Sequence, residues 1–263
     1  GRHFLRIYEE QGTDGVTYEW QLLDFLGAAG VAVPKRVGGT LPGQIAVAGK
    51  PTALFEVVTG EDICGGMFDA ARAHQVGVTL GRIHQAGRAF PIRRESRFRR
   101  DTVLTRLDYA ASQERPELVK PILTLRTICA EVEASYPSDL PRGVIHGDMF
   151  RDNVFWQGAE VSAVIDWESA SDGDLLYDLC VVFLAWCYGD DFRWEEARAL
   201  LTMSAPNTAS GWPDRLALSF HSSSPTPSAA APTPIQLRSR SRVPKNQAPS
   251  SAEKIGMVYP KMA

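Results

Sequence analysis

Three things are scarce in this chain of 263 residues: cysteine, long apolar runs and a strong charge of one sign. The four cysteines do not have the spacing of a metal site, so we expect reduced thiols in a cytoplasmic protein. No apolar run reaches the length of a membrane span, and no secretory signal is expected at the start. A net charge of −3 gives no reason to expect nucleic-acid binding. The composition is typical of a soluble globular protein.

The most informative stretch reads His-Gly-Asp-Met-Phe-Arg-Asp-Asn, from His146 to Asn153, and Asp166 follows it. Asp148 can accept a proton from an attacking hydroxyl. Asn153 and Asp166 offer hard oxygen ligands for magnesium bound to ATP phosphates. The order is that of a protein-kinase catalytic loop followed by the metal-binding aspartate, with His-Gly-Asp in place of His-Arg-Asp. These residues predict a phosphoryl-transfer site.

The flanks of this motif predict how the two metal ligands meet. Residues 144–145 and 154–156 read as short strands, residues 157–160 as a hairpin turn, and residues 161–165 as the returning strand. The hairpin would bring Asp166 back beside the catalytic loop. The alternative is a polar hairpin with scattered acids, because Asp and Asn are common in turns. Ordering, spacing and flanking strands together favour the phosphoryl-transfer site.

Other elements follow from periodicity. In the N-terminal part we predict a strand at residues 3–8, a helix at 17–29 ending at Gly30, and a strand pair at 41–47 and 51–58. From residue 67 onward the chain is mostly helical, with helices at 70–85, at 121–136 with Pro121 in the first turn, and through Trp186. Asp174 could cap the last of these helices, and Tyr177 and Asp178 could brace the catalytic loop from behind.

An arginine-rich stretch lies between two of the helices, at residues 91–100. One interpretation is a solvated basic loop. The other is a binding surface for a substrate carboxylate or phosphate, in which Arg93 and Arg94 take part. The sequence leaves both interpretations open.

The last part of the chain has a different composition. Residues 203–263 hold nine of the 17 prolines, eleven serines and seven Lys or Arg, against only Asp214 and Glu253. Such a segment cannot build a core, so we expect disorder, with Trp212, Leu216, Leu218 and Phe220 as its one apolar cluster. We favour an out-of-frame coding end as its origin over a genuine regulatory or nucleic-acid-binding tail. The preceding residues are acidic overall.

The His146–Trp156 stretch, Val164–Glu168 and Leu175–Leu179 together resemble the aminoglycoside-phosphotransferase-like kinases. Within that superfamily the resemblance is greatest to bacterial homoserine kinases of the kinase-like type, through Phe150–Asn153, Gly87–Glu95 and Pro51–Gly60. It covers roughly residues 3–201. It implies an α+β, protein-kinase-like fold of two lobes, with ATP in the cleft between a small β-rich lobe and a larger helical lobe.

On that layout the domains would be residues 1–59 (partial nucleotide lobe and hinge), 60–202 (helical catalytic lobe) and 203–263 (tail). The resemblance places Glu56 and Val58 at the hinge, where their backbone groups would contact adenine. Arg6 stands where kinases place the lysine that holds the α- and β-phosphates. Glu19 is the nearest helix acid that could pair with Arg6, although as a lone Glu it reads as ordinary surface. Arg151 would contact a substrate or phosphate oxygen.

The resemblance implies a small-molecule kinase that uses ATP and Mg²⁺ and acts on a hydroxyl, most closely that of L-homoserine, as in threonine biosynthesis. The enzyme alternative is another acceptor, such as an aminoglycoside or choline. The strands and the glycine-rich loop that should precede residue 3 are not in this chain, and the tail replaces the usual end of the helical lobe. The second alternative is therefore an inactive, kinase-like remnant. The acceptor and the oligomeric state are left open.

Overall fold

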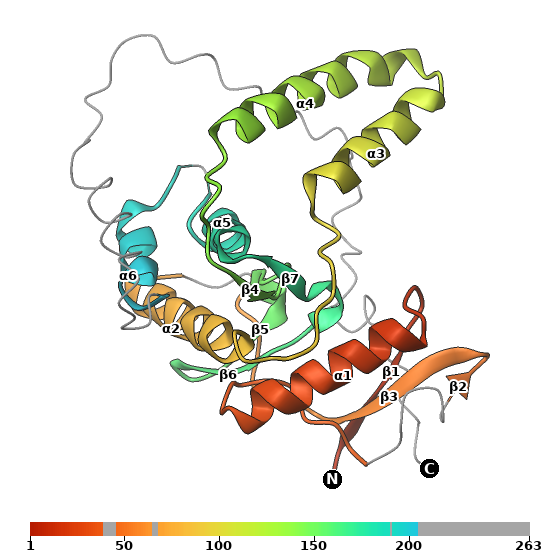
Figure 1. The fold of residues 1–263 in the computed structure, drawn as a ribbon. Helices are drawn as coiled ribbons and strands as arrows, with labels where there is room; N and C mark the ends of the chain where they lie inside the picture. The colour runs from red at the N-terminus through yellow and green to blue at the C-terminus, as the bar shows by residue number, and fades with distance from the viewer. Residues whose placement is uncertain (39–45, 65–67, 190, 205–263) are drawn as a thin grey trace, which may run out of the picture.

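The computed structural model describes residues 1–38, 46–64, 68–189 and 191–204. Its N-terminal part is an antiparallel sheet with strand order β1-β3-β2, formed by β1 (His3–Ile7), β2 (Ala46–Val47) and β3 (Lys50–Glu56). Helix α1 (Thr13–Ala28) lies against one face of this sheet (Figure 1). The predicted first strand and helix are present, but α1 begins at Thr13 rather than Thr17. Of the predicted 41–47 strand, residues 41–45 lie outside the described residues.

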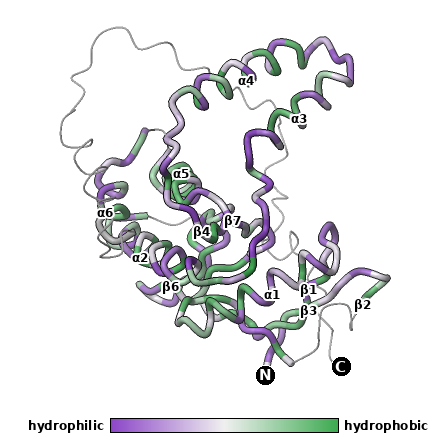
Figure 2. Tube along the Cα trace, viewed as in Figure 1, coloured by the Kyte–Doolittle hydropathy of each residue, from purple (hydrophilic) through white to green (hydrophobic). Residues whose placement is uncertain are grey.

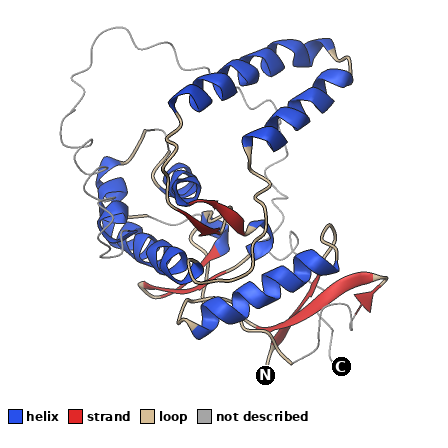
Figure 3. Ribbon diagram, in the orientation of Figure 1, coloured by secondary structure: helices blue, strands red, loops and turns tan. Residues whose placement is uncertain are grey.

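The larger part combines helices with two short strand pairs (Figure 3). Its helices α2, α5 and α6 and its strand pairs β4–β7 and β5–β6 have these bounds: α2 (Ala70–Gly87), β4 (Arg142–Ile145), β5 (Val154–Gln157), β6 (Glu160–Val164), β7 (Ser171–Asp174), α5 (Leu175–Trp186), α6 (Trp194–Ser204). Short 3₁₀ turns η1 (Arg151–Asn153) and η2 (Trp167–Ser169) follow β4 and β6. The predicted hairpin of β5 and β6 is confirmed.

Helices α2 and α6 cross at very close range. A Cβ atom on Gly77 would lie 2.1 Å from the Leu200 carbonyl oxygen, so only glycine allows the two backbones to approach this closely. Val76, Leu80 and Ile83 of α2 are buried, as their helical spacing predicts. Residues 203 and 204 belong to α6, so this helix continues past the predicted boundary at residue 202.

Helices α3 (Arg100–Ser112) and α4 (Pro116–Ser135) form a hairpin that projects from the rest of the molecule (Figure 1). Helix α3 does not follow from the sequence pattern, and α4 begins at Pro116 rather than at the predicted Pro121. Pro116 occupies the first turn, where a missing N–H costs nothing, whereas Pro121 lies inside the helix. Several apolar side chains of α4 are exposed: Val119, Leu123, Leu125, Ile128, Val132. The trace of α4 accordingly contains green, hydrophobic segments (Figure 2).

The two parts meet just after β3. The Glu61 and Trp156 main chains exchange hydrogen bonds of 3.0 and 2.9 Å, and Ser162 Oγ donates to the Thr59 carbonyl oxygen at 2.7 Å. Gly60 has a φ of +119°, and a Cβ there would lie 2.3 Å from the Trp156 carbonyl oxygen. The chain therefore changes direction here, and the α+β fold with a small β-rich part and a larger helical part is confirmed.

The four cysteines are free, as predicted. None of the described helices is both long and apolar enough to cross a membrane. The apolar cluster at residues 212–220 and the rest of the predicted tail from residue 205 lie outside the described residues.

Candidate active site

His146 links the catalytic loop to the strand that carries Asp166. Its Nε2 lies 3.0 Å from the Ile165 carbonyl oxygen, and its Nδ1 lies 3.2 Å from the Asp148 main-chain N–H. Complete burial lowers the pKa of His146, so the ring is neutral. A neutral ring with its proton on Nε2 satisfies both contacts, since Nε2–H donates and Nδ1 accepts. This histidine therefore holds the catalytic loop against the end of β6.

Gly147 explains why this loop reads His-Gly-Asp. Its φ is +81°, a conformation that favours glycine. A Cβ atom there would lie 2.8 Å from Phe98 Cε2 and 3.1 Å from the Ser169 carbonyl oxygen. The arginine of the protein-kinase motif would therefore not fit, and Phe98 occupies the space beside the loop.

Asp178 holds the loop from behind, as predicted. Its carboxylate accepts hydrogen bonds from the main-chain N–H groups of His146 (2.8 Å) and Gly147 (2.7 Å), and it contacts His84 Nε2 at 3.0 Å. Burial acts to raise the pKa of Asp178, but these hydrogen bonds and the neighbouring histidines hold it below its usual value. The carboxylate is therefore ionised inside the protein. No motif or spacing pointed to His84 as a partner of Asp178.

Of the predictions for Tyr177 and Asp174, the structure agrees with the first and not with the second. Tyr177 stacks on Phe98, with ring centroids 4.9 Å apart, and so supports the loop indirectly. Asp174 stands at the N-cap position of α5 but makes no side-chain capping bond, so the predicted cap is wrong. Its carboxylate accepts from Tyr136 at 2.8 Å and from Arg142 at 2.9 Å instead.

Asp148 and Asn153 lie side by side. Asn153 Nδ2 donates to the Asp148 carbonyl oxygen at 2.7 Å and reaches the Asp148 carboxylate at 3.3 Å. Partial burial is the largest cause that raises the pKa of Asp148, and the charge of Asp166 acts in the same direction. A carboxylate held in this way can orient a hydroxyl and accept its proton.

The hairpin returns Asp166 to the same place. The Ile165 N–H donates to the Asn153 carbonyl oxygen at 2.8 Å, which fixes the two segments against each other. Asp166 has a φ of 63°, in the left-handed region that non-glycine residues seldom adopt. Such backbone strain costs on the order of 1 kcal/mol and gathers at functional sites.

Arg6 reaches this site from the small sheet. Its guanidinium lies 2.9 Å from the Asp166 carboxylate, 3.0 Å from that of Glu168 and 3.2 Å from that of Glu19. Arg6 and Asp166 are 160 positions apart in the sequence, so this ion pair joins the two parts of the molecule. Glu168 was not anticipated, although its place two residues after Asp166 could have suggested it.

Glu19 corrects an expectation. It is 1% exposed rather than ordinary surface, and Tyr8 Oη donates to its carboxyl at 3.1 Å. Trp20 Nε1 in turn donates to Tyr8 Oη at 3.3 Å. Burial raises the pKa of Glu19 to about 7, against the opposing effect of Arg6. The helix acid and the strand arginine therefore form an ion pair between α1 and β1.

The oxygen donors fit a magnesium ion. Asn153 turns its amide nitrogen toward Asp148, which leaves its oxygen for another partner, and the Asp166 side chain is 35% exposed. Among the described residues, no three His, Cys, Asp or Glu side chains gather as a metal cluster. Mg²⁺ commonly keeps several waters and takes one or two protein ligands plus substrate phosphates. Two protein oxygens are therefore sufficient.

Two predicted contacts are placed differently. Arg151 donates to the carbonyl oxygens of Ala185 (2.9 Å) and Trp186 (3.0 Å) at the end of α5, so it holds that helix instead of facing a substrate. The Glu56 N–H donates to the Lys35 carbonyl oxygen at 2.8 Å, so this donor is not free for a base. Val58 follows β3 in the segment that joins the two parts.

The arginine-rich stretch runs beside η2 and β7, and its first two arginines differ. Arg93 is 59% exposed and forms an ion pair with Asp172 at 2.6 Å. Arg94 Nη2 donates to the Glu168 carbonyl oxygen at 3.1 Å, while its Nη1 is buried without a hydrogen-bond partner. The Asp172 N–H donates to the Arg94 carbonyl oxygen at 2.7 Å, which fixes the stretch near the site.

The sequence profile of the Phosphotransferase enzyme family matches residues 1–213. The chain belongs to this family. Proteins named homoserine kinase are similar to it: that of Methylobacterium radiotolerans is 34% identical over 209 residues, or 76% of this chain and 63% of the relative. That of Rhodopseudomonas palustris is 34% identical over 212 residues, or 77% of this chain and 63% of the relative. The chain thus spans under two thirds of the length of these curated relatives.

Solved structures share the fold at low identity. An amicoumacin kinase in complex with AMP-PNP, Ca²⁺ and Ami has a TM-score of 0.62 at 16% identity, with 77% of this chain and 65% of that chain covered. An aminoglycoside phosphotransferase from Streptomyces rimosus, in complex with ADP and streptomycin, has a TM-score of 0.56 at 15% identity, with coverage of 79% and 82%. These likenesses show a kinase-like fold.

Proposed function

We propose that this phosphotransferase transfers the γ-phosphoryl group of ATP to a small-molecule hydroxyl, that of L-homoserine. The observation that carries the proposal is the assembly of Asp148, Asn153 and Asp166 by main-chain and side-chain hydrogen bonds. The names of the relatives that are 31–34% identical support the acceptor.

Each of these side chains has a role in the proposed reaction. The Asp148 carboxylate orients the acceptor hydroxyl and takes its proton as the new O–P bond forms and the bond to ADP breaks. Arg6, which can leave Asp166 for an incoming phosphate, offers positive charge to the α- and β-phosphates. Asn153 and Asp166 would hold Mg²⁺, which would neutralise charge on the phosphates. The segment through Val58 would contact the base.

A panel of alcohols with ATP and Mg²⁺, read as ADP release, tests the acceptor. The panel contains L-homoserine, L-serine, choline and kanamycin. The proposal expects the highest kcat/KM with L-homoserine. A higher kcat/KM with choline or kanamycin would overturn the proposed acceptor. If the protein binds nucleotide but none of the alcohols leads to ADP release, it is an inactive remnant.

A further inference from the structure

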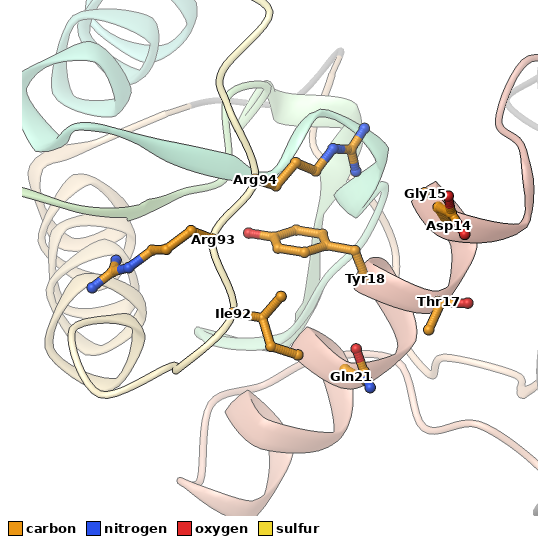
Figure 4. A pocket seen from close by; sticks show the side chains of 8 residues that line it. All are labelled: Asp14, Gly15, Thr17, Tyr18, Gln21, Ile92, Arg93 and Arg94. Atoms are coloured by element: carbon orange, nitrogen blue, oxygen red, sulfur yellow. The ribbon is translucent and has the colours of Figure 1, made fainter.

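A hollow of about 420 Å³ lies between the first turns of α1 and the arginine-rich stretch (Figure 4). Tyr18 and Arg94 line it, and Arg94 also borders a second hollow beside Gln11 and Glu168. The proposed phosphoryl-transfer site does not account for the polar side chains that line this hollow.

Two of these groups lack partners. Tyr18 is 5% exposed, and its hydroxyl makes no hydrogen bond within the described residues. Arg94 Nη1 is buried and unpaired in the same way, and the Arg94 guanidinium carbon lies 5.3 Å from the Tyr18 ring centroid. Figure 4 shows the Tyr18 ring extending from α1 toward the 92–94 segment. An unpaired buried donor costs about 1–3 kcal/mol, so a missing acceptor is indicated at this place.

The surrounding charges select the kind of acceptor. Burial raises the pKa of Tyr18 to about 12, so the hydroxyl is a neutral donor at physiological pH. Arg94 adds a charged donor, and Arg93 lines the same hollow. Asp14 lies on the α1 side and could receive an ammonium group. The Tyr18 hydroxyl and the Arg94 guanidinium can donate to a carboxylate, and Asp14 can accept from an ammonium group. Together these groups match an amino-acid zwitterion.

We propose that Arg94 and Tyr18 bind the carboxylate of an amino acid in this hollow. The identity of the occupant as the acceptor rests on the function proposed above, whereas the binding chemistry does not. Phe98, which belongs to the same arginine-rich stretch as Arg94, lies beside Gly147 of the catalytic loop. The sequence pattern does not distinguish Arg93 from Arg94, whereas in the structure Arg93 pairs with Asp172 and Arg94 carries the unpaired donor.

Calorimetric titration of the full chain tests this, with L-homoserine and with 3-aminopropan-1-ol, which has no carboxylate. Arg94→Gln should weaken L-homoserine binding roughly 10- to 150-fold and leave 3-aminopropan-1-ol binding unchanged, because a hydrogen bond from a charged group is lost. Tyr18→Phe should weaken L-homoserine binding roughly three- to tenfold. Arg99→Gln is the control: it removes an exposed arginine of the same stretch that pairs with Glu95 and Asp101.

Thermal melts separate binding from folding. The Tyr18 hydroxyl makes no hydrogen bond to the part of the chain that the structure describes, so Tyr18→Phe should not lower the melting temperature. Weaker L-homoserine binding in this variant, at an unchanged melting temperature, supports the proposal. Equal binding in Arg94→Gln, Tyr18→Phe and Arg99→Gln overturns it, because the hollow would then hold only solvent.

Kinetics identifies the source of the carboxylate. If the acceptor itself occupies the hollow, Arg94→Gln raises its KM and leaves the KM of ATP unchanged. If a second amino-acid molecule binds there, calorimetry still detects the Arg94 effect while the acceptor KM stays constant. Both results support the site. Absence of turnover with any alcohol, together with Arg94-dependent binding, would refute the proposed function and leave this inference intact.

Discussion

Glu19 shows how one buried side chain makes folding depend on pH. The pKa of its carboxyl rises from 4.5 to about 7 on folding. Between these values the folded protein binds a proton that the unfolded chain does not, so stability falls as pH rises through this window. Glu19→Gln removes the titration. The variant should be more stable than the original chain above pH 7, by on the order of 3 kcal/mol.

Urea unfolding at several pH values measures the effect of Glu19→Gln. The two proteins should have similar stability near pH 4.5 and diverge toward pH 7 and above. Parallel curves over the whole range would contradict the assigned burial of this carboxyl.

Asp166 provides a second test at the same scale. Asp166→Ala should weaken Mg-ATP binding much more than metal-free ATP binding, because the lost oxygen would contact the ion. In the structure this carboxylate also pairs with Arg6, so the variant leaves Arg6 freer to meet phosphates. Titrations with and without magnesium decide the point, and equal losses in both would remove Asp166 from the metal site.

Single residues also show what the sequence could and could not predict. The order and spacing of Asp148, Asn153 and Asp166 predict that these residues meet, and hydrogen bonds between their segments bring them together. Glu19 was misread as surface because its burial depends on Arg6 and Tyr8, which a different element contributes. The Arg151 contacts could not be predicted for a similar reason: they are carbonyl groups at the end of α5, a different element.

At the scale of elements, the contact between α2 and α6 is the tightest in the helical part. Alanine normally stabilises a helix interior relative to glycine by about 1 kcal/mol. Gly77→Ala should instead destabilise the protein, because its Cβ would lie 2.1 Å from the Leu200 carbonyl oxygen. Gly27→Ala is the matched control, since Gly27 is exposed in α1 and its Cβ would meet only Val33 at 3.5 Å.

Thermal melts of both glycine variants test this packing. Gly77→Ala should lower the melting temperature by several degrees and Gly27→Ala should raise it slightly or leave it unchanged. If Gly77→Ala melted like Gly27→Ala, α6 would not pack against α2 in solution.

Periodicity located most elements but not all their ends. The α2 prediction was close because its apolar residues recur at helical spacing and face one core. For α4, Pro121 predicts a start that is too late, because Pro116 provides the start signal and the later proline is accommodated inside the helix. Helix α3 buries only Leu107, so its pattern gave little to recognise.

For the whole molecule, the residues after α6, 205–263, stay predicted to contribute little to the fold. Their serine and proline content cannot offset an ordering entropy of roughly 1–2 kcal/mol per residue. Because α6 extends to Ser204, the informative truncation is after that residue rather than at Thr202. The truncated and full chains should melt at the same temperature. A clearly lower value for the truncated form would show that this segment packs on the rest.

The proposed phosphoryl transfer depends most on Asp148, and a comparison of the original chain with Asp148→Asn tests the role of this carboxylate directly. ADP release with L-homoserine, ATP and Mg²⁺ is measured for the original chain and for Asp148→Asn, together with ATP binding. Loss of a positioned base typically costs about 10² to 10⁴ in rate. We predict that Asp148→Asn lowers kcat by that amount and keeps ATP affinity within a few-fold. Turnover in Asp148→Asn close to that of the original chain would contradict the assignment of this site.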